Sequence, residues 1–193
     1  MPTLTIIIGS TRPGRAGEPI AEWFAARARA HGGFDVEVAD LAEIGLPMMD
    51  EPQHPRLRQY TQQHTRDWSE RIDRADAVVF ITPEYNYGYP AALKNAIDYL
   101  HEEWRDKPAG FVSYGGVAAG TRAVQQLKQV VTTLRMVPVV DSVNIPFHPQ
   151  FITDGRFAAN DVLDQAADAM LDELLRVGGA LHPLRAKAAG AVA

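Results

Sequence analysis

The sequence predicts an α/β fold in which a parallel sheet lies between two layers of helices. Five strand-like apolar runs alternate with five helix-like patterns along the chain. Strict alternation of this kind requires parallel pairing through right-handed crossovers. Most of the runs are nearly continuous Val, Ile and Phe, which is typical of strands covered on both faces. The chain has 193 residues, 46% of them hydrophobic, which is enough for one sizeable core.

The strand runs also predict an order within the sheet. They are residues 4–8, 34–39, 77–81, 108–114 and 137–140. The second run alternates apolar and polar side chains, which places it at an edge of the sheet. Five strands favour the flavodoxin-like order 2-1-3-4-5, a three-layer sandwich whose topological switch point lies between the first and third strands.

Each expected helix has apolar residues at a period of 3.6. The apolar faces are Ile20, Phe24 and Ala28; Tyr60, Trp68 and Ile72; Leu93, Ile97, Leu100 and Trp104; Val124, Leu127, Val131 and Leu134; and Leu163, Ala167, Met170, Leu171 and Leu174. The second helix is expected at about residues 57–75. The third begins at Pro90, because a missing N–H costs nothing at the first helical position.

The remaining segments define the domain organisation. Residues 1–185 form a single expected domain, since no linker or internal repeat divides them. Residues 141–160 have no period and contain several breakers, so they predict a long loop of the kind that is often functional. Residues 186–193 are rich in Ala and Gly and are expected to be a disordered tail.

Composition excludes several classes of protein. The formal net charge is −5 with a pI of about 5.6, and no basic face suggests a nucleic-acid partner. The absence of cysteine rules out disulfides, thiolate catalysis and Cys-ligated metals. The first residues resemble no signal peptide, and no apolar run approaches the roughly 20 residues of a membrane span. A cytoplasmic protein is therefore expected. The six histidines show no ligand spacing, so no metal is predicted.

The loop after the first strand has the chemistry of a phosphate site. Residues 9–17 read GSTRPGRAG. They combine hydroxyls, two arginines and glycines before a helix, whose N-terminus attracts anions. The loop nearly matches a Walker A motif, but Arg15 replaces the lysine and Ala16 replaces the hydroxyl residue. It also lacks the Gly-x-Gly-x-x-Gly pattern of a dinucleotide site, although Asp40 stands where a ribose-binding acid would. A plain strand–helix turn with surface arginines is the structural alternative.

The loop after the third strand has the chemistry of a ring-binding site. Residues 82–90 read TPEYNYGYP, with three tyrosines for stacking and a glycine for close approach. The tyrosines would alternatively pack on a partner subunit, and both roles are compatible. Glu84 is interpreted as a strand-end carboxylate that holds its own loop. Because both loops follow strands at the predicted switch point, they suggest a phosphorylated aromatic cofactor.

A third loop and a few charged residues complete the candidates. Residues 112–120 read VSYGGVAAG, and Ser113, Tyr114, Gly115 and Gly116 suit the carbonyls of an isoalloxazine or pyrimidine ring; a glycine-rich turn without ligand is the alternative. The glycine spacing disfavours a serine hydrolase. Lys94 and Asp98 are an i, i+4 pair. Residues 101–103 (His-Glu-Glu) are interpreted as a solvated helix end, and His148 as a surface histidine.

The first two loops together resemble the NAD(P)H-dependent FMN reductase family, which includes chromate, azo-dye and quinone reductases. The resemblance rests on residues 9–15 (GSTRPGR) and residues 83–98 (PEYNYGYPAALKNAID), and it extends over about residues 4–181. It implies a flavodoxin-like fold, bound FMN, NADPH or NADH as co-substrate, and a homodimer or homotetramer. The neighbouring subunit would help complete the site, with residues 141–160 as a candidate cover.

The resemblance also implies a set of cofactor-binding residues. Ser10, Arg12, Arg15, Ala16 and Gly17 would hold the phosphate; Pro83, Glu84, Tyr85, Asn86 and Tyr87 would follow the ring and the ribityl chain; Ser113, Gly115 and Gly116 would contact the far end of the ring. The flavin N5 would carry the chemistry, so no catalytic side chain is expected. A flavodoxin-type electron carrier with protein partners is the alternative function, and a flavin-free scaffold of the same fold is a third.

Overall fold

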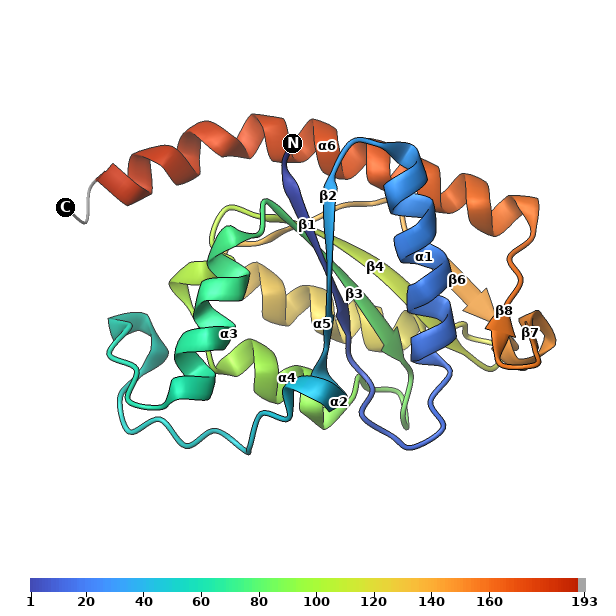
Figure 1. Ribbon diagram of the computed structural model, residues 1–193, viewed down its shortest axis with the longest axis horizontal. Coiled ribbons are helices and arrows are strands. Elements are labelled where there is room, and N and C mark those ends of the chain that lie inside the picture. The colour runs from blue at the N-terminus through green and yellow to red at the C-terminus, as the bar shows by residue number, and fades with distance from the viewer. Residues whose placement is uncertain (191–193) are drawn as a thin grey trace.

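The computed structural model describes residues 1–190 of the chain, and side chains through Arg185. Its centre is a parallel sheet covered by helices on both faces (Figure 1). The strands are β1 (Thr3–Ile8), β2 (Asp35–Asp40), β3 (Ala77–Pro83), β4 (Pro108–Gly115), β5 (Val137–Pro138) and β6 (Val143–Pro146). The strand order β2-β1-β3-β4-β5 confirms the predicted topology and the edge position of the second strand.

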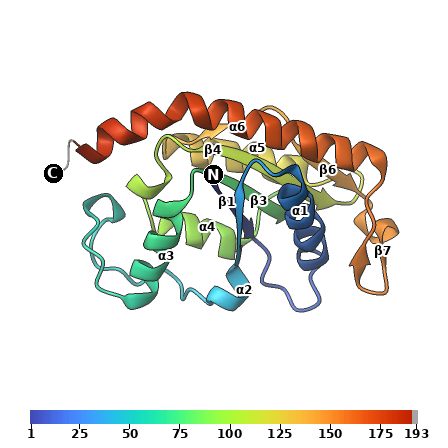
Figure 2. The ribbon, with the colours of Figure 1, turned by 45° about the horizontal axis from the view of Figure 1, so that its top comes forward.

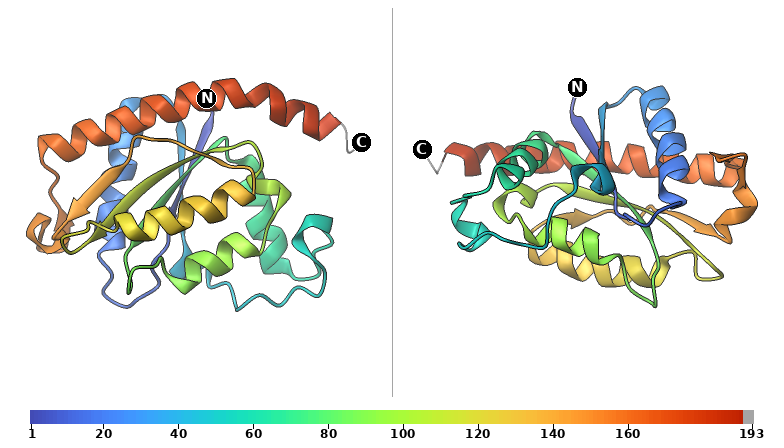
Figure 3. Two further views of the ribbon diagram at one scale, coloured as in Figure 1. Left: turned by 180° about the vertical axis from the view of Figure 1, so that it is seen from behind. Right: turned by 60° about the horizontal axis from the view of Figure 1, so that its bottom comes forward.

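The helices form two layers. They are α1 (Gly17–His31), α2 (Leu41–Ile44), α3 (Gln63–Arg74), α4 (Ala91–Asp98), α5 (Thr121–Thr133) and α6 (Asp161–Gly190), with short 3₁₀ turns η1 (Pro55–Leu57), η2 (Glu102–Trp104) and η3 (His148–Phe151). One core cluster packs α1 and α6 on the sheet, and the other packs α3, α4 and α5 on the opposite face. Figure 3 shows α4 and α5 in front of the sheet when the molecule is seen from behind.

The far edge of the sheet differs from the prediction of one strand at residues 137–140. The chain pairs with the start of β4 only over Val137–Pro138, leaves the sheet, and returns as β6 beside the end of β4, with Val112 opposite Val143. Val140 is 86% exposed, so the apolar run continues beyond the residues that pair with β4. Pro138 is tolerated because an edge strand needs no donor on its outer side.

The sequence predicted a structureless loop at residues 141–160, and this prediction is wrong. They contain β6, η3 and a hairpin of β7 (Ile152–Thr153) and β8 (Arg156–Phe157). The ring of Phe157 packs against Trp23 of α1 with 5.1 Å between centroids. The segment therefore lies against the N-terminal half of α1, on the α6 face of the sheet.

Helix α6 is the longest element, and Figure 2 shows it running across the width of the molecule. Its bounds reach Gly190, so its last turns include residues 186–190 of the segment expected to be a disordered tail. Residues 191–193 lie outside the described residues, where that expectation stays a prediction. Among the described residues, no helix combines the length and hydropathy that a membrane span needs.

Helix α3, the second of the predicted helices, begins at Gln63 rather than near Leu57. The carboxylate of Glu51 explains the difference, because it organises the irregular chain before α3. It accepts hydrogen bonds from the backbone N–H of Thr61 at 2.8 Å and of Gln62 at 3.0 Å. Partial burial alone would raise the pKa of Glu51, but these hydrogen bonds outweigh it and lower the pKa to about 2.

We expect Glu51 to stabilise the protein above about pH 4.5 and to lose that contribution as the pH falls toward 2. The sign follows because the folded pKa lies below the unfolded one, so the unfolded chain binds the proton more readily in that window. Glu51→Gln should reduce the free energy of unfolding at pH 7 by on the order of 1 kcal/mol, a value discounted for solvent screening. Thermal unfolding between pH 2 and pH 7 measures this. Glu22→Gln, an exposed neutralisation on α1, is the control. Identical pH profiles for Glu51→Gln and wild type would contradict the assignment.

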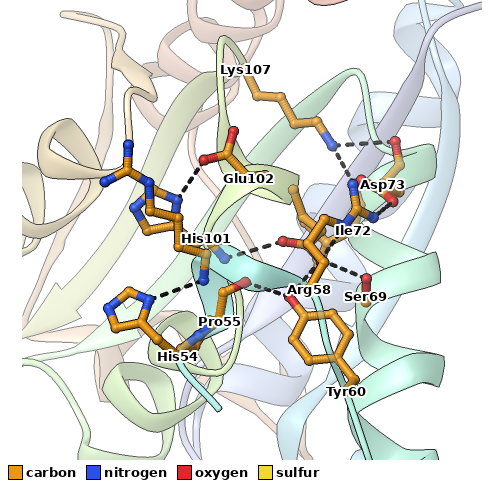
Figure 4. A network of polar contacts seen from close by, with 12 residues as sticks. His54, Pro55, Arg58, Tyr60, Ser69, Ile72, Asp73, His101, Glu102 and Lys107 are labelled. Carbon is orange, nitrogen blue, oxygen red and sulfur yellow. Dashed lines mark hydrogen bonds and ion pairs between the residues drawn. The ribbon is translucent and has the colours of Figure 1, made fainter. Parts of the chain in front are cut away.

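Helix α4, the third of the predicted helices, ends at Asp98. The interpretation of residues 101–103 as a solvated helix end is wrong for Glu103. Its side chain is fully buried. Its carboxylate accepts hydrogen bonds from Tyr60 Oη at 2.7 Å, Ser69 Oγ at 2.6 Å and the His101 N–H at 3.1 Å. Arg58 lies 3.4 Å away and also pairs with Asp73 (Figure 4).

Lys107 belongs to the same buried region, at the amino end of β4. Its ammonium donates to the carbonyls of Ile72 and Asp73 at the end of α3 (Figure 4). Burial lowers the pKa of Lys107 to about 8. These contacts anchor η2 and α3 at the amino edge of the sheet, opposite to the loops at the carboxyl ends of the strands.

Candidate functional site

The three loops singled out in the sequence meet at the carboxyl ends of β1, β3 and β4. They surround a cavity of about 700 Å³, within the usual size range of ligand pockets. The cavity is lined by Arg12, Gly14, Arg15, Ala16, Pro83, Glu84, Tyr85, Tyr114, Gly115, Gly116, Phe147, His148, Pro149 and Gln150. The cationic loop and the tyrosine-containing loop thus form two walls of one crevice.

The first wall is the loop between β1 and α1. Arg12 lines the cavity, and within the described residues its guanidinium forms no ion pair. The N-terminus of α1 carries no side-chain cap, so its first N–H groups are available to an anion. Gly17 starts the helix against Tyr114, and a Cβ there would lie 2.8 Å from the Tyr114 hydroxyl. Only glycine therefore lets α1 begin this close to β4.

Arg15 differs from Arg12, because its charge is already compensated. Its Nη2 contacts a carboxylate oxygen of Asp40 and lies 3.9 Å from Glu18. Asp40 is almost buried at the end of β2, and its other oxygen caps α2 through the N–H of Ala42. The carboxylate that the sequence offered as a ribose ligand therefore holds an arginine. The Nε of Arg15 is buried and has no hydrogen-bond partner among the described residues.

The second wall is a tight turn after β3. Tyr85 and Gly88 exchange two backbone hydrogen bonds of 2.8 and 2.9 Å around Asn86 and Tyr87, which have φ of +50° and +73°. The hydroxyl of Tyr85 shares a 2.7 Å hydrogen bond with the buried Ser10 Oγ. The turn and the first loop are therefore connected directly, although 75 residues separate the two partners.

The sequence predicted that Glu84 holds its own loop, but its carboxylate instead holds the neighbouring helix α5. One oxygen of its nearly buried carboxylate pairs with the guanidinium of Arg122, and the other accepts the Arg122 N–H at 3.2 Å. The same guanidinium lies 3.8 Å from the centroid of the Tyr87 ring, a cation–π contact. Arg122 thus braces the turn against the first turn of α5.

The third wall is the end of β4. Tyr114 is 3% exposed, and burial raises its pKa, so it stays protonated at neutral pH. Gly120 has φ of +80°, and a Cβ there would lie 2.9 Å from the Tyr114 nitrogen, which explains the glycine. Ser113 points away from the cavity: its hydroxyl is buried and donates to the carbonyl of Ala119 at 2.8 Å.

A fourth wall comes from the segment 141–160, which the sequence offered only as a candidate cover, without naming site residues within it. Phe147, His148, Pro149 and Gln150 follow β6 and line the cavity of their own chain. The interpretation of His148 as a surface residue is wrong. Its Nδ1 donates to the carbonyl of Gly115 at 3.3 Å, and its ring meets Tyr114 edge-on at 5.1 Å. The only sequence signal was the long aperiodic segment itself.

Nine of the fourteen predicted site residues line the cavity. The other five are Ser10, Gly17, Asn86, Tyr87 and Ser113, which support its walls from behind or beside. The arrangement suits a ligand with an anionic group at one end, beside Arg12 and the start of α1, and a flat ring at the other, beside Tyr85 and Gly115.

Comparisons with known proteins agree with this chemistry. Residues 2–150 match the family model described as NADPH-dependent FMN reductase. An NAD(P)H-dependent FMN reductase of Schizosaccharomyces pombe is 43% identical over 149 residues, covering 75% of this chain and 74% of the relative. An FMN-dependent NADPH-azoreductase of Staphylococcus haemolyticus is 27% identical over 69% of this chain and 71% of its own. Among solved structures, the NAD(P)H:acceptor oxidoreductase FerB of Paracoccus denitrificans aligns with a TM-score of 0.72 at 25% identity, covering 91% of this chain and 98% of FerB.

Proposed function

This chain belongs to the NADPH-dependent FMN reductase family, and we propose that it uses FMN to pass a hydride from NADPH or NADH to a small-molecule acceptor. The observation that carries the proposal is that a cationic loop and an aromatic turn line the same cavity. The acceptor classes are a quinone, an azo compound, chromate or free flavin. The azo class is supported by the names of several relatives, the Staphylococcus haemolyticus protein among them.

The residues present fit the cofactor. The guanidinium of Arg12, which forms no ion pair among the described residues, and the uncapped start of α1 form a cradle for a phosphate monoester, with the compensated Arg15 beside them. Ala16 and Gly17 have small side chains or none, which would let the phosphate approach the backbone. A volume of about 700 Å³ accommodates a tricyclic ring with its ribityl chain.

The protein contributes binding and orientation. When bound, FMN supplies a ring nitrogen, N5, that accepts and returns the hydride. Pro83 and Tyr85 would form one wall for the ring, and the backbone of Gly115 and Gly116 the neighbouring wall. Asn86 and Tyr87 hold the turn in shape, and Ser113 fixes the loop behind the glycines. Glu84 is committed to Arg122, so it is not a free acid, which is consistent with chemistry that needs no catalytic side chain.

We further propose that the active protein is a cytoplasmic homodimer or homotetramer. Tyr85 and Tyr87, in the turn beside the cavity, are exposed by 37% and 61%. A second copy would cover these rings and complete the site. The residues 147–150 already line the cavity of their own chain, so a partner is not needed for that wall.

The alternative of a flavodoxin-type electron carrier would use the same cavity with protein partners. The mild net charge of −5 and the family membership favour the reductase. Direct turnover of a nicotinamide nucleotide separates the two functions, since a carrier would not oxidise NADPH unaided.

The test is made on the purified chain. We expect it to bind FMN with a yellow colour and a flavin absorbance band, and to oxidise NADPH or NADH when a quinone or an azo dye is added. Titration with FMN and the absorbance of the nicotinamide measure both. A protein that FMN does not titrate, or one that holds FMN and leaves both nucleotides untouched, would refute the reductase.

A further inference from the structure

Two aromatic residues beside the cavity have an unusual backbone conformation. Among the described residues, eight non-glycine residues have positive φ, and only Tyr87 and Phe147 of these are aromatic. Bulky residues rarely occupy the left-handed region, because the Cβ crowds the following carbonyl. Such strain persists where the surroundings enforce it, and it gathers at ligand-binding sites.

The conformation of Tyr87 has a structural explanation. It occupies the second central position of the turn closed by Tyr85 and Gly88, where positive φ is required. Its ring stacks under the guanidinium of Arg122. The side chain is therefore held by a contact within the protein.

Phe147 has no comparable explanation. With φ and ψ both at 46°, it turns the chain from β6 into η3, and its backbone bonds to Gly116 and Gln150. None of these contacts requires a side chain, and glycine adopts this conformation without strain. Phe147 is 54% exposed at the wall of the cavity, and its ring forms no aromatic pair among the described residues. Neither the turn nor the core accounts for a phenylalanine here.

We propose that the ring of Phe147 is a stacking platform for a flat conjugated ring in the cavity, and the proposal rests on the function proposed above. The exposed ring offers contact area and a π face to a ligand. Pro149 and His148 line the same wall of the cavity. Two molecules of that function have the required ring: the flavin itself, and a planar second substrate such as a quinone.

The experiment compares Phe147→Gly, Phe147→Ala and Phe147→Tyr with wild type. Phe147→Gly removes the ring and the strain, whereas Phe147→Ala removes only the ring. Thermal unfolding of the apoprotein should therefore give Phe147→Gly a Tm about 2–4 °C above that of Phe147→Ala. Arg135→Gly, which relieves a φ of +62° at the opposite edge of the sheet, is the control for strain relief without ring loss.

Binding is measured separately for the two candidate rings. The dissociation constant of FMN is obtained by fluorescence titration, and KM is obtained for menadione, a flat quinone, and for ferricyanide, which has no ring. Removal of the Phe147 ring should weaken the binding of either FMN or menadione by roughly 5- to 150-fold, the range for stacking on an aromatic side chain. Phe147→Tyr and Arg135→Gly should retain the wild-type dissociation constant and KM values. Because ferricyanide has no ring to stack, its KM should not change when the Phe147 ring is removed, even if the KM for menadione rises.

The outcomes separate cleanly. A raised FMN dissociation constant assigns the platform to the flavin, and a raised KM for menadione alone assigns it to the second substrate. If wild type binds FMN and reduces menadione, and Phe147→Gly does both equally well, the platform is refuted while the reductase stands. Equal Tm values for Phe147→Gly and Phe147→Ala would also overturn the proposal, because its premise is strain. Failure of wild type to bind FMN would refute the reductase and the platform together.

Discussion

Replacing Arg12 by alanine is expected to weaken FMN binding by roughly 10- to 150-fold. This corresponds to the 1.5–3 kcal/mol of a charged hydrogen bond. The guanidinium lines the cavity and forms no ion pair within the described residues, so its whole charge is available to the phosphate. Riboflavin, which lacks the phosphate, should bind the variant and the wild type equally. Fluorescence titration with both flavins measures the effect.

The matched control is the double variant Arg15→Gln/Asp40→Asn. Both members of the pair lose their charge, so the net charge of the loop is unchanged. Asparagine also keeps an oxygen for the N–H of Ala42. We expect FMN affinity within about threefold of wild type, since Asp40 already compensates Arg15. If the double variant loses as much affinity as Arg12→Ala, both arginines hold the phosphate, and the division of roles between them is wrong.

The strand order could be predicted because it depends on local patterns. Nearly continuous apolar runs identify buried strands, and alternation with helices leaves few topologies. The first and last residues of each element were harder to predict. The delayed start of α3 depends on Glu51, and the divided edge strand depends on where β4 offers free partners. Neither is visible in the hydrophobic period of the segment itself.

The candidate site shows the same division. Loops at the ends of β1, β3 and β4 were placed correctly, because the carboxyl ends of parallel strands share one edge. The partners of individual side chains were not predictable, since they join segments distant in sequence. Arg15 meets Asp40 across 25 residues, and Glu84 meets Arg122 across 38. The wall at residues 147–150 required the return of the chain through β6, for which the sequence has no periodic signal.

The largest effect on stability is expected from Glu103→Ala, far from the cavity. The substitution leaves the hydroxyls of Tyr60 and Ser69 without their acceptor and removes one of the two carboxylates that face Arg58. Removing one partner of a buried charge network costs about 3–5 kcal/mol. For a chain of this size, Tm should fall by on the order of 10 °C. Thermal and denaturant unfolding of the apoprotein measure the loss.

Glu102→Ala is the control, because it removes the same side chain one position earlier. Its carboxylate is 31% exposed and pairs with His101 and Arg105, so its loss should cost less than about 1 kcal/mol. Both variants should keep wild-type FMN affinity, since the network lies at the amino edge of the sheet and the cavity at the carboxyl edge. Equal Tm values for the two variants would mean that the Glu103 network contributes no more than a surface pair. A Glu103→Ala protein that folds normally but binds FMN poorly would instead show that the two edges of the sheet are energetically coupled.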